Sequence, residues 1–259
     1  MIRFVALAFF FLLAFGCLSQ IRLDKLVLEP KQKFVIENTD ILVVDTLIMK
    51  DSSSIFLNLS KQNNFIHAKQ VVVGKGCSIL GNGKNGEKGK PGEPGARQPA
   101  PCRSGSSGAG ASNGFSGEHG VDLSLYMNSL KINGSILINL NGGDGGDGGK
   151  GGDGGDGGSG TRVCPAGDGG KGGNGAHGGG GGQGGSLVIK CKTCEDLHLI
   201  MGNKLTVKNF GGFGGLGGDG GAGGHAGLGP LRDGTNGPRG VNGKSAPQGK
   251  TGGVNLGRE

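Results

Sequence analysis

Short apolar strings separated by polar clusters fill the first part of the chain. From Gln20 to Val73 there is no glycine, and no window shows an apolar stripe with a 3.6-residue period. β-Branched strings bounded by clusters such as Asp51-Ser52-Ser53-Ser54 are typical of strands rather than helices. The pattern predicts serial short strands, whose apolar strings are Leu26–Leu28, Phe34–Ile36, Ile41–Ile48, Ile55–Leu57, Phe65–Ile66 and Val71–Val73.

After Gly74 the chain alternates between strands and long glycine-rich excursions. A strand ends and an excursion begins at three junctions, which are Cys77–Gly81, Ile136–Gly142 and Leu205–Gly211. The chain returns to strand at Val121–Tyr126 and Leu187–Lys190. An internal repeat of this kind indicates stacked rungs, and we expect a short right-handed parallel β-solenoid.

Each excursion holds two runs with glycine at every third position, separated by a corner. Gly142–Ser159 and Gly169–Ser186 are Gly-Gly-x runs, whereas the first excursion and the return run of the third are Gly-x-x. Alanine alone replaces glycine in these slots, which indicates a steric limit. Period three matches a polyproline II-type helix, whose bare glycine edge admits a neighbouring backbone. We therefore expect three hairpins packed as a six-helix polyglycine II bundle in two layers, in an all-β/polyproline II fold class.

The run Gly142–Lys150 and its hairpin partners resemble the polyglycine II bundles of snow-flea antifreeze proteins and of T-even phage tail-fibre adhesins. The alternation of strand and hairpin also resembles secreted, glycine-rich, collagen-like β-helix proteins. This likeness covers about residues 81–259 and concerns the repeat pattern, so it implies no active residue. Two other interpretations are a disordered linker, which needs no phase, and a collagen triple helix, which needs longer and proline-rich runs.

Composition and charge exclude several classes of function. Glycine makes up 63 of the 259 residues, there is one Tyr and no Trp, and the net charge is +7. The basic residues are scattered, whereas a nucleic-acid surface needs a clustered basic patch. We therefore expect no nucleic-acid partner and no aromatic-rich globular core.

The N-terminus predicts export. Arg3 precedes an apolar stretch, Phe4–Phe15, that fits a signal-peptide core and is too short to span a bilayer. Cleavage before Gln20 is one interpretation. The other is an imperfect lipobox, Ala14–Cys17, that would lipidate Cys17 and make a lipid anchor the link to a membrane. Either interpretation places the protein outside the cell, as a secreted or cell-surface protein.

Five cysteines remain if Cys17 is removed with the signal peptide. Cys102 and Cys164 lie in the first two corners, which stacked hairpins would bring together, so we expect a Cys102–Cys164 disulfide. Cys191 and Cys194 form a CxxC pair, which could be a redox pair, half a zinc site or part of a structural disulfide. The favoured interpretation bonds Cys77 to Cys191 or Cys194, with the pairing left open.

No constellation in the sequence predicts catalysis or a cofactor. The outward column of the second excursion, Asp144, Asp147, Lys150, Asp153, Asp156 and Ser159, spaces its carboxylates too widely to share one calcium, so we expect a solvated face. His119, His177 and His225 lie on different runs without a base–nucleophile pairing, and we interpret them as surface residues. We expect no enzyme, no metal site and no cofactor.

The expected organisation has three parts. These are a signal peptide over 1–19, solenoid strands over 20–80, and strand-plus-hairpin repeats over 81–259, with hairpins at about 81–120, 142–186 and 211–253. The expected function is that of an exported structural or adhesive protein, whose partners would be surface glycans or extracellular matrix. Ice binding and a polysaccharide-acting β-helix enzyme are the alternatives.

Overall fold

The computed structural model describes residues 20–194 and 197–258. The expected signal peptide over 1–19 and the lipidation of Cys17 therefore lie outside the described residues. Regular structure consists of the following elements: β1 (Ile21–Leu28), β2 (Lys33–Val35), β3 (Ile41–Met49), β4 (Ser54–Phe56), β5 (Asn63–Val73), β6 (Cys77–Leu80), β7 (Asp122–Ile132), β8 (Ile136–Asn139), β9 (Leu187–Cys191), α1 (Leu197–Ile200), β10 (Leu205–Lys208) and β11 (Val254–Arg258).

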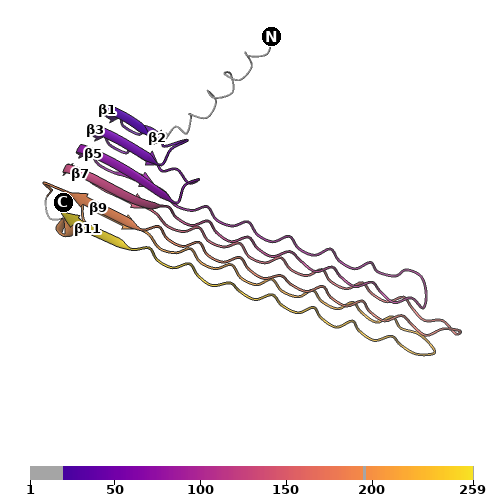
Figure 1. Ribbon diagram of the computed structural model, residues 1–259. Helices are drawn as coiled ribbons and strands as arrows, with labels where there is room; N and C mark the ends of the chain where they lie inside the picture. Colours follow the sequence, from indigo (N-terminus) through magenta and orange to yellow (C-terminus); the bar gives the residue numbers. More distant parts are fainter. Residues whose placement is uncertain (1–19, 195–196, 259) are drawn as a thin grey trace, which may run out of the picture.

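The strands form two parallel sheets, and successive strands of the chain alternate between them. The six-stranded sheet has the order β1-β3-β5-β7-β9-β11 (Figure 1). The five-stranded sheet has the order β10-β8-β6-β4-β2. The register between neighbouring strands keeps like residues level, as in Leu47 beside Val71 and Ile79 beside Ile138. Gly76 and Gly202, in turns that lead to the five-stranded sheet, have φ of 67° and 78°, a conformation that glycine adopts without strain.

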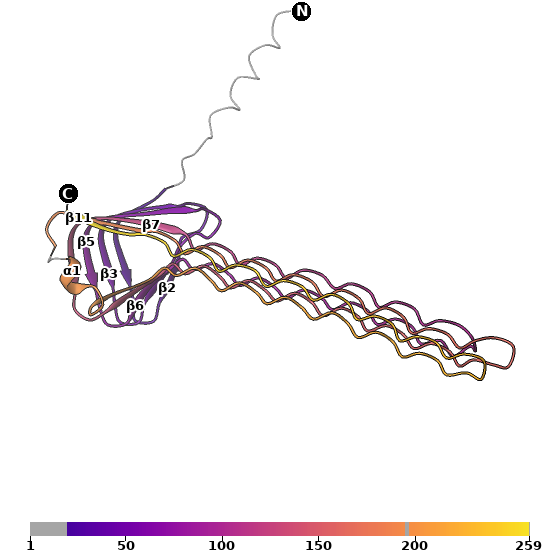
Figure 2. The ribbon, with the colours of Figure 1, turned by 90° about the horizontal axis from the view of Figure 1, so that it is seen from below.

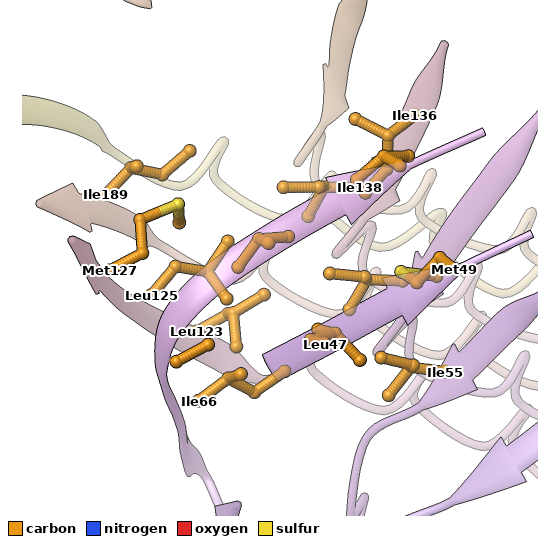
Figure 3. Packing of buried hydrophobic residues seen from close by; sticks show 14 of the residues in the cluster. Leu47, Met49, Ile55, Ile66, Leu123, Leu125, Met127, Ile136, Ile138 and Ile189 are labelled. Carbon is orange, nitrogen blue, oxygen red and sulfur yellow. The ribbon is translucent and has the colours of Figure 1, made fainter. Parts of the chain in front are cut away.

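Alternation along each strand places the core between the sheets. Burial alternates over Ile41–Val44 and Leu47–Met49 of β3 and over Asp122–Met127 of β7, which is the period that a strand with one covered face requires. Leu125 of β7 and Ile138 of β8 come from opposite sheets and lie in one packed cluster (Figure 3). Apolar burial is therefore concentrated in the two sheets, and in the glycine-rich hairpins it includes Ala166 and Ala176.

The fold class expected from the sequence, a short right-handed parallel β-solenoid with a six-helix polyglycine II bundle, is wrong. The regular secondary structure of the described residues is two parallel sheets of six and five strands, with one helix of four residues. The physical reason is that a glycine period shows which positions face a neighbour but does not dictate a helical backbone, since glycine is conformationally permissive. The alternating apolar strands are the pattern that defines the fold.

The glycine-rich hairpins extend together from one end of the sheets, as Figures 1 and 2 show from two directions. We call residues 81–121, 140–186 and 209–253 the arm. Its hairpins leave the ends of β6, β8 and β10 and return to β7, β9 and β11. The sheets therefore hold both ends of every hairpin.

Candidate functional site

The six runs of the arm lie in two rows. The outgoing runs, 81–96, 142–158 and 211–227, form the first row, and the return runs, 105–120, 167–185 and 234–252, form the second. Within the first row, Gly86 N donates to Asp144 O at 2.7 Å and Gly145 N donates to Phe213 O at 2.8 Å. Between rows, Gly179 N donates to Gly146 O at 2.8 Å. Backbone bonds of this kind recur at every third residue along the runs and join each run to its neighbours.

Glycine is required where these backbones meet. A Cβ on Gly146 would overlap the carbonyl of Glu87, and a Cβ on Gly179 would overlap the carbonyl of Phe115. Run 211–227 is hydrogen-bonded to three runs, 142–158, 167–185 and 234–252, and is Gly-Gly-x. Run 234–252 is hydrogen-bonded to two, 167–185 and 211–227, and is Gly-x-x. The number of neighbours therefore explains why the two runs of the third hairpin differ in glycine content.

The outward residues of the first row satisfy the backbone of the next run. Asp144 Oδ1 accepts Phe213 N at 2.8 Å, Asp147 Oδ1 accepts Leu216 N at 3.0 Å, and Asp153 Oδ1 accepts Ala222 N at 2.8 Å. Many glycine amides of the runs donate to backbone carbonyls, whereas the amides of these outward residues donate to a side-chain oxygen of the neighbouring run. A short side-chain acceptor therefore satisfies each of these backbone donors. These aspartates, interpreted from sequence as a solvated face, are parts of the scaffold.

Hydrogen bonds from backbone amides lower the pKa of three aspartate carboxyls of the arm, two in the first row and one in the second. The amide of Leu216 is the main cause at Asp147, with Lys88 adding to it, and the amide of Ala222 is the main cause at Asp153, with Lys150 adding to it. The pKa of Asp168, in the second row, is lowered by the amide and hydroxyl of Thr235. A donated hydrogen bond favours the ionised form of a carboxyl.

Two of the three histidines play the same part. His119 Nδ1 accepts Gln183 N at 2.7 Å and His177 Nδ1 accepts Lys244 N at 2.9 Å. His225 instead donates its backbone N to Asp156 Oδ1 at 2.9 Å. The sequence analysis placed all three on the surface but missed this role. The signal that could have found it is the frequency of Asp, Asn, Ser and His at outward positions, since all four offer a short acceptor.

The cysteines of the described residues form two disulfides. Cys102 and Cys164 are bonded at the far turns of the first and second hairpins, with their Cα atoms 6.0 Å apart. Cys191 and Cys194 are bonded to each other directly after β9. Cys77 is a buried free thiol, so the interpretation that bonded it to Cys191 or Cys194 is wrong. Cys77 lies on the inner face of β6 and its Sγ contacts the carbonyl of Lys50 at 3.2 Å, away from the β9 loop.

The turns at the far end of the arm expose both apolar and basic side chains. Val163 is 89% exposed, Leu228 is 71% exposed and Leu231 is 59% exposed. Four exposed arginines lie in or beside the same turns, at Arg97, Arg103, Arg162 and Arg232. We call these seven residues the tip. Exposed apolar groups beside cations are a surface that can contact a partner.

A hollow lies on the first-row face where the arm leaves the sheets. It has a volume of about 480 Å³ and is lined by Asn82, Gly83, Asn85, Asn139, Asn141, Gly142, Asp144, Phe210, Gly211, Gly212, Phe213 and Gln248. The described residues contain no group of three or more His, Cys, Asp or Glu side chains placed to hold a metal ion. Among them, no helix has the length and apolar character needed to cross a membrane.

Comparison with known proteins assigns no family. No family model matches the chain, and no curated protein matches it. One solved structure, the nine-helix polyproline type II springtail antifreeze protein from Granisotoma rainieri, shows 25% sequence identity over 57% of this chain and 94% of its own. The TM-score of 0.09 means that the two chains do not superpose, so the antifreeze function of that protein carries nothing over to this one.

The disulfides bear on the compartment. Disulfides persist in oxidising environments and are rare in the cytosol. The two disulfides of this chain are consistent with an extracellular location.

Proposed function

We propose that this protein is an exported, non-catalytic structural and adhesive protein whose arm presents contact surfaces at a distance from the sheets. The observation that carries the proposal is the bonding of the arm, in which backbone hydrogen bonds tie six runs into one unit along their length. Ordering so many glycines is entropically costly, and a flexible spacer would not need it. A stiff arm would hold a contact surface at a fixed position relative to the sheets.

The tip is the proposed contact surface. It lies at the end of the arm that is farthest from the sheets (Figure 2), and the Cys102–Cys164 disulfide joins two of its turns. Loops that a rigid scaffold positions are frequent sites of recognition. Export, to a secreted or cell-surface location, is the part of the proposal that rests on the N-terminal sequence.

Binding of the purified chain from Gln20 onward to whole cells and to extracellular matrix tests the proposal. We expect saturable binding that falls when Val163 and Leu228 are both changed to Ser. Val241→Ser is the matched control, because Val241 is 67% exposed but lies midway along the second row. Absence of saturable binding to every surface would overturn the adhesive function. Small-angle scattering of a flexible, collapsed arm would overturn the structural one.

A further inference from the structure

The hollow at the base of the arm carries a chemistry that the tip lacks. Residues from three adjacent runs face it in two level rows, Asn82–Asn141–Phe210 and Asn85–Asp144–Phe213. We call these six residues the amide–phenyl patch. The volume of about 480 Å³ is within the range of small-ligand sites, which is about 300–1,000 Å³.

Hydrogen bonds to the backbone fix the orientation of the polar groups. Asn85 Oδ1 accepts Asp144 N at 2.9 Å, and Asn141 Oδ1 accepts Phe210 N at 2.9 Å. Each amide is thus held by its oxygen, while its Nδ2 group donates no hydrogen bond to the described residues. Asp144 uses Oδ1 to accept Phe213 N, which leaves Oδ2 as an acceptor. The patch therefore holds donors and an acceptor in place before any ligand arrives.

Two exposed aromatic rings lie beside these groups. Phe210 is 59% exposed and Phe213 is 70% exposed, although large apolar side chains are usually covered. They occupy successive outward positions of one run, so their rings line the same side of the hollow. Apolar surface next to a few fixed polar groups is the usual composition of a small-ligand site.

The charge of the hollow restricts the ligand. No Lys or Arg lines it, and Asp144 is its one carboxylate. Lys84 lies between Gly83 and Asn85 in the chain but is not among the lining residues. Lys88, one triplet beyond Asn85 on the same column, is paired with Asp147 at 3.0 Å. An anionic ligand would therefore find no cation among the lining residues. A ligand with many hydroxyl groups, each able to donate and accept, and with an apolar ring face suits the amides, the carboxylate and the rings together.

We propose that the amide–phenyl patch binds a neutral saccharide. A pyranose ring would lie with its apolar face on Phe213, its hydroxyl oxygens accepting from the Nδ2 groups of Asn85 and Asn141 and a hydroxyl donating to Asp144 Oδ2. The inference rests on the adhesive function proposed above, for which it names a ligand class, and it adds a second contact site at the base of the arm to the one at the tip.

The experiment measures binding of the chain from Gln20 onward to soluble neutral oligosaccharides ending in glucose, galactose, mannose or N-acetylglucosamine. We expect binding to at least one of them. Phe213→Ala should weaken it about tenfold or more through loss of the aromatic contact. Asn85→Ser should weaken it by about three- to tenfold, because Ser keeps an acceptor for Asp144 N but lacks the amide donor.

The structure supplies matched controls on other faces of the arm. Ser104 Oγ accepts Asp168 N at 3.1 Å, which is the arrangement that Asn85→Ser would copy. Asn113→Ser makes the same change in the second row, where Asn113 Oδ1 accepts His177 N at 2.9 Å. Phe115→Ala removes a ring that is 66% exposed outside the patch. Both control variants should bind the saccharide within about twofold of the unchanged chain.

Three results would overturn the inference. They are no binding to any neutral oligosaccharide, binding that the patch variants leave unchanged, and binding confined to sulfated or sialylated sugars. Failure of the adhesive function gives a different result, because the chain would then bind no cell or matrix surface while soluble sugars could still bind the patch. Surface binding by a chain that binds no soluble sugar through Phe213 and Asn85 removes this inference alone.

Discussion

Single positions in the arm differ sharply in the space that they offer, even when they are adjacent in the chain. A Cβ added at Gly179 would overlap the carbonyl of Phe115, whereas a Cβ added at Gly180 would have Ser116 Oγ at 3.7 Å as its nearest contact. Neither Gly179 nor Gly180 has a positive φ. At Gly179 glycine is needed for close approach of two backbones, whereas at Gly180 it only adds freedom to the unfolded chain.

We therefore expect opposite effects from two neighbouring substitutions. Gly179→Ala should destabilise the protein by about 1–3 kcal/mol, because the new methyl group forces two hydrogen-bonded backbones apart. Gly180→Ala should be neutral or stabilise by up to about 1 kcal/mol through the unfolded state. Thermal and denaturant unfolding measure both. Equal effects of the two changes would contradict the close-packing account.

The outward aspartates give the arm a dependence on pH. Folding lowers the pKa of Asp147, Asp153 and Asp168 below the ordinary value of 3.8. Their contribution to stability is therefore complete above that value and is lost as the pH falls through the lower folded values. We expect the melting temperature to fall as the pH is lowered from about 4 toward 2.

A variant with Asp147, Asp153 and Asp168 all changed to Asn tests this cause. An asparagine keeps a side-chain oxygen for the neighbouring amide but does not titrate in this range. The acid-dependent loss of stability should be smaller in this variant than in the unchanged chain. An identical pH profile would assign the acid sensitivity to other groups.

At the scale of elements, the two disulfides differ in what they join. Cys102–Cys164 links turns of separate hairpins over a sequence separation of 62, whereas Cys191–Cys194 closes a loop with a separation of 3. The entropy that a cross-link removes from the unfolded chain rises with the logarithm of loop length. The tip disulfide should therefore stabilise the protein more than the short one.

The prediction compares two double variants. Changing Cys102 and Cys164 to Ser should cost about 4 kcal/mol in the chain-entropy account. Changing Cys191 and Cys194 to Ser should cost less, at about 1–2 kcal/mol. Denaturant unfolding of both variants measures the difference. A larger loss from the second pair would show that the short disulfide acts on the native state, for example by holding the loop before α1.

Elements also show where sequence analysis succeeded and where it did not. The alternating string from Ile41 to Ile48 predicted a strand that the structure places at Ile41–Met49. The strings at Phe65–Ile66 and Val71–Val73 are parts of one strand, β5, because His67, Lys69 and Gln70 take outward positions between buried neighbours. β11 was missed, since Val254, Asn255 and Leu256 contain only one of the alternations that mark a strand, and pairing with β9 supplies the rest.

At the scale of the whole molecule, residues at the junction of the sheets and the arm belong to both parts. Leu140 is fully buried where β8 continues into the arm, and its backbone N donates to Lys208 O at 2.7 Å. Its carbonyl accepts Gly185 N at 2.7 Å. The same residue therefore belongs to the apolar core and to the arm's hydrogen bonding, so the two parts should unfold together.

Leu140→Ala tests this coupling. We expect a loss of about 2–5 kcal/mol, typical of a large buried side chain reduced to alanine. Amide hydrogen exchange should then speed up in both the sheets and the arm. Leu216→Ala, at a position that is 65% exposed, should change neither. Faster exchange restricted to the sheets would show that the arm is stable by itself.

The sequence alone determined where apolar residues alternate and which positions require glycine. Alternating apolar residues share one face of a strand, and that face must be buried. Glycine at every third position marks an edge where another backbone approaches too closely for a Cβ. Only the tertiary structure decided the two-sheet fold, the free Cys77, the acceptor role of the outward aspartates and the amide–phenyl patch. Asn85 and Asp144, or Asp144 and Phe213, are 59 and 69 residues apart in the chain. Contacts at such separations depend on how the hairpins stack, and no local pattern specifies that arrangement.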